Sequence, residues 1–348
     1  MTDYQVMSDK AIYTVSEDIE AMLACLYLLH DEDDFLALNL YSKTQIEDWK
    51  KRYRFLFETF HAVKDLTNIS ILDFLLDSIS EELSLDSIQS SIARLNKGER
   101  IYRLIDWPYD CGIASETILK ALSDDGILNS LFFTVQESCS NFLGFSCFLR
   151  ENDRYLNEFF DLSRELINDA LREKLISSEK QFWDFKNNLI QDLQNESPFE
   201  VSQRMMGKKF KNVGPYDHYY FVPTLLLFRK CVRLFYNDGT SNNKQILIYN
   251  ISQPQFSTIS LLPVLKIISD ETRYQILKLL QHTSPLNSKE LSHELQLAPS
   301  TVSHHISLLK DVGLINEEPV KNSKYYSISE TKMKEVLKKL LEDFSIDL

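Results

Sequence analysis

The chain has 348 residues, of which 44% are hydrophobic and 26% are charged, and its formal net charge is −13. This length fits two or three domains, and the composition excludes wholesale disorder. No apolar run is long enough to cross a bilayer, and the N-terminus lacks the pattern of a signal peptide. The five cysteines are scattered, which fits buried thiols better than a disulfide framework or a zinc site. The sequence therefore predicts a cytoplasmic protein without a membrane segment.

The first two-thirds of the chain is predicted to be mainly helical. Ser16 precedes two acidic residues and an apolar series at helical spacing, which predicts a capped amphipathic helix. Thr44 and Glu47 form a capping-box pattern that opens a long segment through Trp49. Residues 197–207 begin with Ser-Pro and end with Gly, a pattern typical of a complete short helix.

Near residue 217 the spacing of the apolar residues changes from a helical pattern to one typical of β-strands. Three short runs at 219–222, 232–236 and 245–249 are rich in β-branched and aromatic residues, and Asn-Asp-Gly lies between the last two. We interpret the region near 217–250 as a β-hairpin that closes a mostly helical first domain, residues 1–255. The predicted fold class is mainly α with small β elements, and residues 256–348 form a second domain.

The second domain has the element order of a winged helix-turn-helix. Apolar residues predict a helix at 261–268, and Asp270 starts another helix. Asn287 with Glu290 caps a short helix, and the bend at 296–299 leads into the next one. Strands at 314–318 and 324–328 flank a polar turn at 319–323 and form the wing. The last helix, 331–344, carries more apolar surface than one wing covers, which suggests a dimer contact.

The helix that begins at Pro299 has two different faces. Val302, Ile306 and Leu309 are four and three residues apart and form a buried stripe. Small hydroxyl side chains and an imidazole lie on the opposite side, where they suit the major groove of B-DNA. The predicted DNA-binding residues are Pro299, Ser300, Thr301, Ser303, His304 and Ser307 on this helix and Lys321, Asn322 and Lys324 on the wing. Because neighbours on a helix are about 100° apart, His304 is expected to face DNA and His305 to pack or cap within the domain.

The acidic charge is unevenly distributed. Residues 261–348 contain ten Lys and one Arg against four Asp and eight Glu, so their formal charge is −1 and the rest of the chain carries −12. DNA affinity would therefore depend on a few well-placed cations rather than on a broad basic field. Arg273 is interpreted as a salt-bridge or phosphate-contacting residue, and the pair Tyr325-Tyr326 as one inward and one outward strand residue.

Several ordered motifs resemble the ArsR family of bacterial winged-helix repressors. They are Ser-Asp-Glu-Thr-Arg-Tyr-Gln-Ile-Leu at 269–277, Ser-Thr-Val-Ser-His-His-Ile at 300–306, Val-Gly-Leu-Ile at 312–315 and Lys-Tyr-Tyr-Ser-Ile at 324–328. The resemblance covers about 85 residues, roughly a quarter of the chain. It implies a homodimer on a palindromic operator, with the first and last helices of this domain at the dimer interface. It also implies repression that a bound effector relieves.

The chain departs from the metal-sensing members of that family. Asn287 and Lys289 stand where those members carry Cys-x-Cys, and no His follows His305. We therefore predict no metal and no cofactor. The enlarged N-terminal region is the candidate sensor of a small-molecule or peptide effector.

Two other classes of function remain open. An enzyme would need a recognisable constellation, and the sequence has no Gly-rich phosphate loop, Gly-x-Ser-x-Gly elbow or His-Glu-x-x-His motif. His30, His61 and His218 are isolated from one another in the sequence and leave a dispersed site open, but in the absence of these motifs we predict that the protein is not an enzyme. A module that uses its winged helix to bind protein without specific DNA binding is the alternative, and the acidic net charge favours it.

Overall fold

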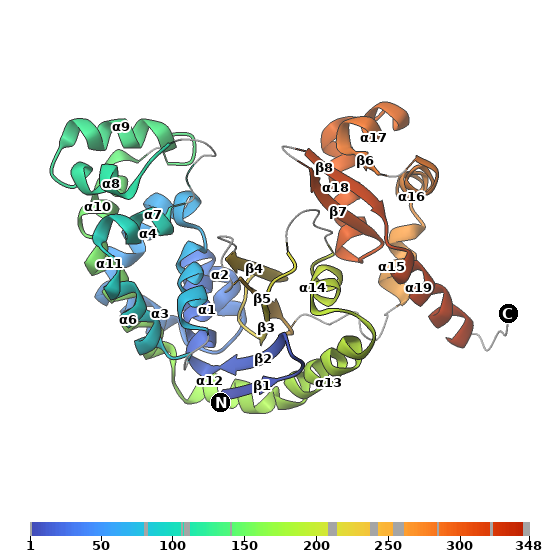
Figure 1. Cartoon of the computed structure of the whole chain (residues 1–348), viewed down its shortest axis with the longest axis horizontal. Helices are drawn as coiled ribbons and strands as arrows, with labels where there is room; N and C mark the ends of the chain where they lie inside the picture. Colours follow the sequence, from blue (N-terminus) through green and yellow to red (C-terminus); the bar gives the residue numbers. More distant parts are fainter. Residues whose placement is uncertain are drawn as a thin grey trace. The chain divides into compact units, whose positions relative to one another are not determined.

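The structure is a computed structural model that describes residues 2–79, 83–105, 107, 112–139, 141–207, 214–236, 243–252, 261–283, 285–320 and 323–343 (Figure 1). The chain divides into two compact units. The first consists of Met1–Ile190 with Tyr216–Gln253, and the second of Gln191–Pro215 with Pro254–Leu348. The sequence predicts one division after residue 255, whereas the compact units group residues 191–215 with the C-terminal elements.

The first unit contains a five-stranded mixed sheet. Its strands are β1 (Thr2–Val6), β2 (Ala11–Ser16), β3 (His218–Thr224), β4 (Cys231–Tyr236) and β5 (Lys244–Asn250), in the order β1-β2-β3-β5-β4. β4 and β5 form the predicted antiparallel hairpin, and its Asn-Asp-Gly turn lies outside the described residues. β3 instead runs parallel to both β2 and β5. β1 and β2 are not predicted from the sequence, and β2 has its parallel partner about 200 residues further along the chain.

Helix α1 (Glu17–His30) lies at the centre of this unit. Every residue from Ile19 to Leu26 is buried, so the helix is covered on all sides and the amphipathic prediction for it is wrong. Ser16 has the extended backbone of an N-cap, but its hydroxyl donates to the carbonyl of Leu83 at 2.7 Å instead of capping α1. This bond ties the entry of α1 to the chain that precedes α6 (Leu85–Arg94).

The remaining helices of the first unit pack against α1, against the sheet or against one another. They are α2 (Glu32–Ala37), α3 (Lys43–Arg52), α4 (Arg54–Thr67), the 3-10 helix η1 (Ser70–Phe74), α5 (Leu75–Ser78), α7 (Lys97–Leu104), α8 (Ser115–Ala121), α9 (Asp125–Val135), α10 (Phe142–Arg150), α11 (Asn152–Leu166), α12 (Asp169–Ser177) and α13 (Glu179–Asn195), which continues past Ile190 into the second unit. The capping box of α3 uses Ser42 and Gln45, two residues before the predicted pair. Tyr53 separates α3 from α4, so the predicted long segment is two helices.

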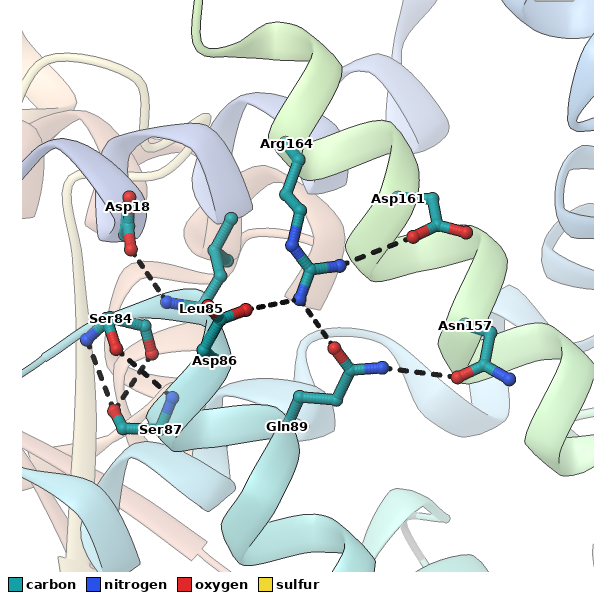
Figure 2. Close-up of polar contacts among 9 residues, drawn as sticks. All are labelled: Asp18, Ser84, Leu85, Asp86, Ser87, Gln89, Asn157, Asp161 and Arg164. Carbon is teal, nitrogen blue, oxygen red and sulfur yellow. Dashed lines mark hydrogen bonds and ion pairs between the residues drawn. The ribbon is translucent and has the colours of Figure 1, made fainter.

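Polar contacts fix α6 against α1 and α11 (Figure 2). The Asp18 carboxylate on α1 accepts the backbone N–H of Leu85 at 2.7 Å. The Arg164 guanidinium on α11 donates to Asp86 at 2.7 Å and to Gln89 at 2.6 Å. The Asp86 side chain is 84% exposed, so this ion pair orients the two helices but contributes little to stability.

The second unit contains the predicted winged helix-turn-helix. Its elements are α14 (Pro198–Met206), α15 (Leu261–Ile268), α16 (Glu271–Thr283), β6 (Leu286–Asn287), α17 (Ser288–Leu295), α18 (Pro299–Asp311), β7 (Ile315–Val320), β8 (Ser323–Ile328) and α19 (Glu330–Asp343). The strands pair antiparallel in the order β6-β8-β7. One apolar core holds the elements from α15 to α19 together and includes Ile276, Leu291, Val302 and Val336.

α14 is the helix predicted at 197–207. The Ser197 hydroxyl and the Glu200 carboxylate form the capping box, and Pro198 is the first helical residue. Gly207 ends the helix at φ 66°, a left-handed conformation that favours glycine. The carbonyl of Gly207 accepts the backbone N–H of Glu317 on β7 at 3.2 Å, so α14 adjoins the wing sheet.

Candidate nucleic-acid interface

The turn between α17 and α18 is set by local signals at both ends of α17. The Asn287 carboxamide accepts from the backbone N–H groups of Lys289 at 2.9 Å and Glu290 at 3.0 Å, and the Glu290 carboxylate accepts the N–H of Asn287. At the other end Gln296 adopts a left-handed conformation with φ 56°. Only two residues then separate this helix end from Pro299, so α17 and α18 are joined by a tight turn.

The buried stripe of α18 is the one that the sequence predicts. Val302 and Leu309 are fully buried and Ile306 is 3% exposed. These three side chains belong to the same apolar core as Leu291 of α17 and Ile276 of α16. Burying one side of the helix fixes its rotation, so the opposite side is held toward solvent.

The exposed side of α18 carries all six residues that the sequence assigns to this helix as DNA contacts. Pro299, Ser300, Thr301, Ser303, His304 and Ser307 are each exposed. Small side chains here leave room for a groove wall, and their hydroxyls can donate or accept hydrogen bonds. Contact of these residues with DNA stays a prediction.

His305 lies on the inner side of the same helix. Its side chain is 14% exposed, and Nδ1 lies 3.8 Å from Oδ1 of Asp270. The backbone N–H of Arg273, which donates to Asp270 at 3.0 Å, holds the pKa of the Asp270 carboxyl below its usual range, and His305 adds to this effect. The Asp270 carboxylate thus connects the start of α16 to α18.

Arg273 has a structural position in this unit. Its Nε donates to the carbonyl of Ile267 at 2.6 Å, and its guanidinium lies 3.9 Å from the Asp270 carboxylate. The side chain is only 14% exposed. Of the two roles expected from the sequence, the structure therefore favours the intradomain one, in which Arg273 caps the end of α15.

The wing is a longer hairpin than the sequence predicts. β7 extends to Val320 and β8 begins at Ser323, because the backbone pairing continues through Pro319 and Lys324. Tyr326 is 5% exposed and Tyr325 is half-buried, in agreement with one inward and one outward ring. The Lys324 side chain is 63% exposed. Lys321 and Asn322, the other two predicted wing contacts, lie outside the described residues.

Glu317 is a buried acidic residue of β7 that is not among the residues predicted from the sequence. It is 3% exposed, and its carboxylate accepts from Lys310 of α18 and lies 3.5 Å from Lys324 of β8. Side chains on a strand alternate between its two faces, so the buried Ile315 indicates that residue 317 also points inward. An acidic residue at an inward position of a strand requires a partner, and this requirement is the signal in the sequence that could have identified Glu317.

Groups of three or more His, Cys, Asp or Glu that could hold a metal ion are absent from the part of the chain that the structure describes. At the position of the metal-sensor cysteines, the Asn287 side chain is occupied in capping α17. Among the described residues, no helix is both long enough and apolar enough to cross a membrane.

Comparison with known proteins agrees with this geometry. Residues 270–317 match the family described as "Bacterial regulatory protein, arsR family". An uncharacterized HTH-type transcriptional regulator of Methanocaldococcus jannaschii is 31% identical over 75 residues, which are 22% of this chain and 84% of that protein. The transcriptional activator HlyU of Vibrio cholerae is 30% identical over 91 residues, 26% of this chain and 83% of that protein. The cadmium resistance transcriptional regulatory protein CadC of Listeria innocua is 31% identical over 78 residues, 22% of this chain and 66% of that protein.

Two solved structures are also similar to part of this chain. Reduced HlyU of Vibrio cholerae matches with 30% identity and a TM-score of 0.21, over 24% of this chain and 88% of that one. NolR of Sinorhizobium fredii matches with 23% identity and a TM-score of 0.21, over 28% of this chain and 96% of that one. The family match lies in the winged helix-turn-helix, and the three relatives match 22%, 26% and 22% of this chain. Through this C-terminal region the chain belongs to the arsR family of bacterial regulatory proteins, and it is a DNA-binding transcriptional regulator.

Proposed function

We propose that the protein represses transcription by binding operator DNA through α18 and the wing. The observation that carries this proposal is the exposed row of small polar side chains on α18, opposite a stripe that anchors the helix in the core. In the bound state Ser303 and His304 would contact base edges or phosphates in the major groove. Lys321, Asn322 and Lys324 would contact the backbone or the minor groove beside it.

The test is an electrophoretic mobility shift with the DNA upstream of the protein's own gene, at several salt concentrations. Wild type is expected to bind this duplex specifically, and binding should weaken steeply as salt rises. Ser303→Ala and His304→Ala are each expected to cost about 1–3 kcal/mol, a loss of roughly 5- to 150-fold in affinity for the specific duplex. His282→Ala is the matched control, because His282 is also an exposed imidazole on a helix of the same unit.

If Ser303→Ala and His304→Ala both bound the upstream DNA with wild-type affinity, the proposed role of α18 as the recognition helix would be contradicted. No preference of wild type for its upstream DNA would favour the other candidate, a module that binds protein through its winged helix. The net charge of −13 supports that candidate, since acidic proteins bind DNA weakly unless their cations are concentrated.

We further propose that the protein acts as a homodimer in the cytoplasm. On the first and last helices of the winged domain, Leu265 of α15 is 37% exposed and Leu337 of α19 is 57% exposed. Apolar side chains on these two helices would be buried by a second copy, which would also place two recognition helices for a palindromic site. A sedimentation measurement that finds only monomers at micromolar concentration would contradict this.

The first unit is proposed to sense an effector, either a small molecule or a peptide. Asn287 and Lys289 argue against a metal bound through thiolates at α17. A compound that raises the melting temperature of the full chain and also weakens DNA binding would support the sensor role. Chemical turnover of that compound would instead indicate an enzyme.

A further inference from the structure

Glu317 is a carboxylate that the wing buries. It is 3% exposed and faces inward from β7, two residues after the fully buried Ile315. Removing a carboxylate from water costs several kcal/mol unless cations and hydrogen-bond donors compensate for it. Because an uncompensated charge would disfavour the observed hairpin, the partners of Glu317 are part of the wing's structure.

Two lysines from different elements provide that compensation. Lys310, in the last turn of α18, donates to Oε2 of Glu317. Lys324, on β8, has its Nζ 3.5 Å from Oε1. The Lys310 side chain is 30% exposed and the Lys324 side chain 63% exposed, so both reach the solvent side of the wing while they are held by one buried anion. An ion pair with a buried partner is screened by salt less than a surface pair.

The backbone of Glu317 is fixed as well. Its N–H donates to the carbonyl of Gly207, where α14 ends. In the hairpin Glu317 lies opposite Tyr326 of β8. One residue therefore contacts α14 through its main chain and both the recognition helix and the second wing strand through its side chain.

We propose that Glu317 sets the ratio of specific to non-specific DNA binding by holding Lys310 and Lys324 in fixed positions. This inference rests on the proposed function. On operator DNA the wing docks, and the exposed Lys324 ammonium contacts one phosphate while Glu317 keeps it in place. On unrelated DNA the wing does not dock, and Glu317 retains the lysine so that it adds little electrostatic affinity. Glu317 acts through the lysines and is a positioning residue.

The experiment measures fluorescence anisotropy with the full chain at a series of salt concentrations. One duplex is the upstream DNA that wild type prefers, and the other has the same length and composition in scrambled order. Each phosphate contact contributes about 0.9 to the slope of log affinity against log salt. Glu317→Gln is expected to steepen this slope by about 1 on the scrambled duplex and to leave it almost unchanged on the upstream duplex. The ratio of the two affinities should then fall at least threefold.

Glu330→Gln is the matched control for lost negative charge. Glu330 is at the start of α19, its side chain is 82% exposed, and its ion pair with Lys334 spans 3.8 Å. This variant should change the affinity for both duplexes equally and leave both slopes as in wild type. Equal effects of Glu317→Gln and Glu330→Gln would overturn the proposal.

Lys324→Gln tests the same arrangement from the other side of the ion pair, with the Glu317 carboxylate and its bond to Lys310 retained. We expect it to reduce the slope by about 0.9 on the upstream duplex and by less than about half of that on the scrambled duplex. A full reduction on both duplexes would overturn the proposal, because Lys324 would then contact phosphates without restraint. In the Lys324→Gln background, Glu317→Gln should no longer steepen the slope. If wild type shows no preference between the duplexes, the proposed function fails, and this inference fails with it.

Discussion

Glu20 on α1 is a carboxyl group that is almost completely removed from solvent. It is 1% exposed, and its oxygens accept from the Thr224 hydroxyl at 2.7 Å and from the N–H groups of Leu225 at 2.8 Å and Leu226 at 3.2 Å. Burial raises the pKa of Glu20 to about 7, even though these three donors favour the ionised form. The side chain thus fastens the central helix to the end of β3 and carries a proton over an unusual pH range.

The raised pKa makes stability depend on pH. Since Glu20 binds its proton more tightly in the folded than in the unfolded chain, where its pKa is about 4.3, its contribution to stability falls as pH rises from about 4.3 to about 7. The difference in unfolding free energy between wild type and Glu20→Gln should therefore decrease by about 2–3 kcal/mol between pH 5 and pH 8. Urea unfolding followed by tryptophan fluorescence measures the stability of the first unit, which contains Glu20. Trp49, Trp107 and Trp183 all lie in that unit.

Glu173→Gln provides the comparison, since Glu173 is an exposed glutamate of the same unit. The change with pH for Glu20→Gln should exceed the change for this exposed control. Equal changes for the two variants would contradict the raised pKa of Glu20.

The sequence predicts which way a side chain points where the helical repeat alone decides its direction. The spacing of Val302, Ile306 and Leu309 is enough to separate the exposed His304 from the inward His305. Glu317 was missed because its charge contradicts its inward position, and its partners Lys310 and Lys324 lie seven residues away on either side. Ion pairs between elements leave no periodic pattern in the sequence.

At the scale of elements, α7 and α8 approach each other closely at Gly98. A Cβ atom at this position would lie 2.4 Å from the backbone oxygen of Ser115 and 2.7 Å from Cγ of Leu119. Because the nearer atom is backbone, one of the two helices must move to accept a methyl group. Gly98→Ala is therefore expected to lower the free energy of unfolding by about 1–3 kcal/mol, measured by urea unfolding.

Gly126→Ala is the control for added helix propensity. Gly126 is near the start of α9, and its added Cβ would meet only the Asp124 side chain, at 3.2 Å. This Asp124 oxygen caps α9, but it needs to shift by only a few tenths of an ångström and no backbone atom is in the way, so this variant should cost less than about 1 kcal/mol. Equal effects of the two substitutions would contradict the close packing at Gly98.

The elements that could be predicted are those whose ends are marked locally. α14, α17 and α18 begin or end at caps, at a proline or at a left-handed residue that the sequence displays. β1 and β2 carry no such mark, because β2 is defined by pairing with β3 on the far side of the helical region. Ser42 and Thr44 each begin a capping pattern, and local rules do not decide between two that overlap.

At the scale of the whole molecule, the division into two units shows where the net negative charge lies. Residues 191–215 contain one Arg and three Lys against one Asp and two Glu, so the unit that includes the winged domain has no formal net charge. The entire −13 then belongs to the first unit. Because like charges repel, the first unit opposes DNA binding, and most strongly at low salt, where screening is weakest.

The composition of the second unit predicts the behaviour of a fragment. Residues 254–348 alone lack the Gly207 carbonyl that accepts the Glu317 N–H. Hydrogen exchange at the Glu317 amide is therefore expected to be at least about tenfold faster in this fragment than in the full chain. The Ser329 amide should exchange equally in both, because its acceptor, the carbonyl of Leu314, is present in the fragment. Equal protection of Glu317 in both would contradict a role for α14 beside the wing.

The interleaved order of the two units also has a consequence for biosynthesis. Residues 191–215 leave the ribosome before β3, β4 and β5, which complete the sheet of the first unit, and before every other element of the second unit. α14 is therefore synthesised about one hundred residues before Glu317, whose N–H bonds to the carbonyl of Gly207 at the end of this helix. Nascent chains stalled before residue 317 therefore have α14 without the wing strands, whereas a gene fusion that joins a foreign sensor at residue 254 would have the wing strands without α14.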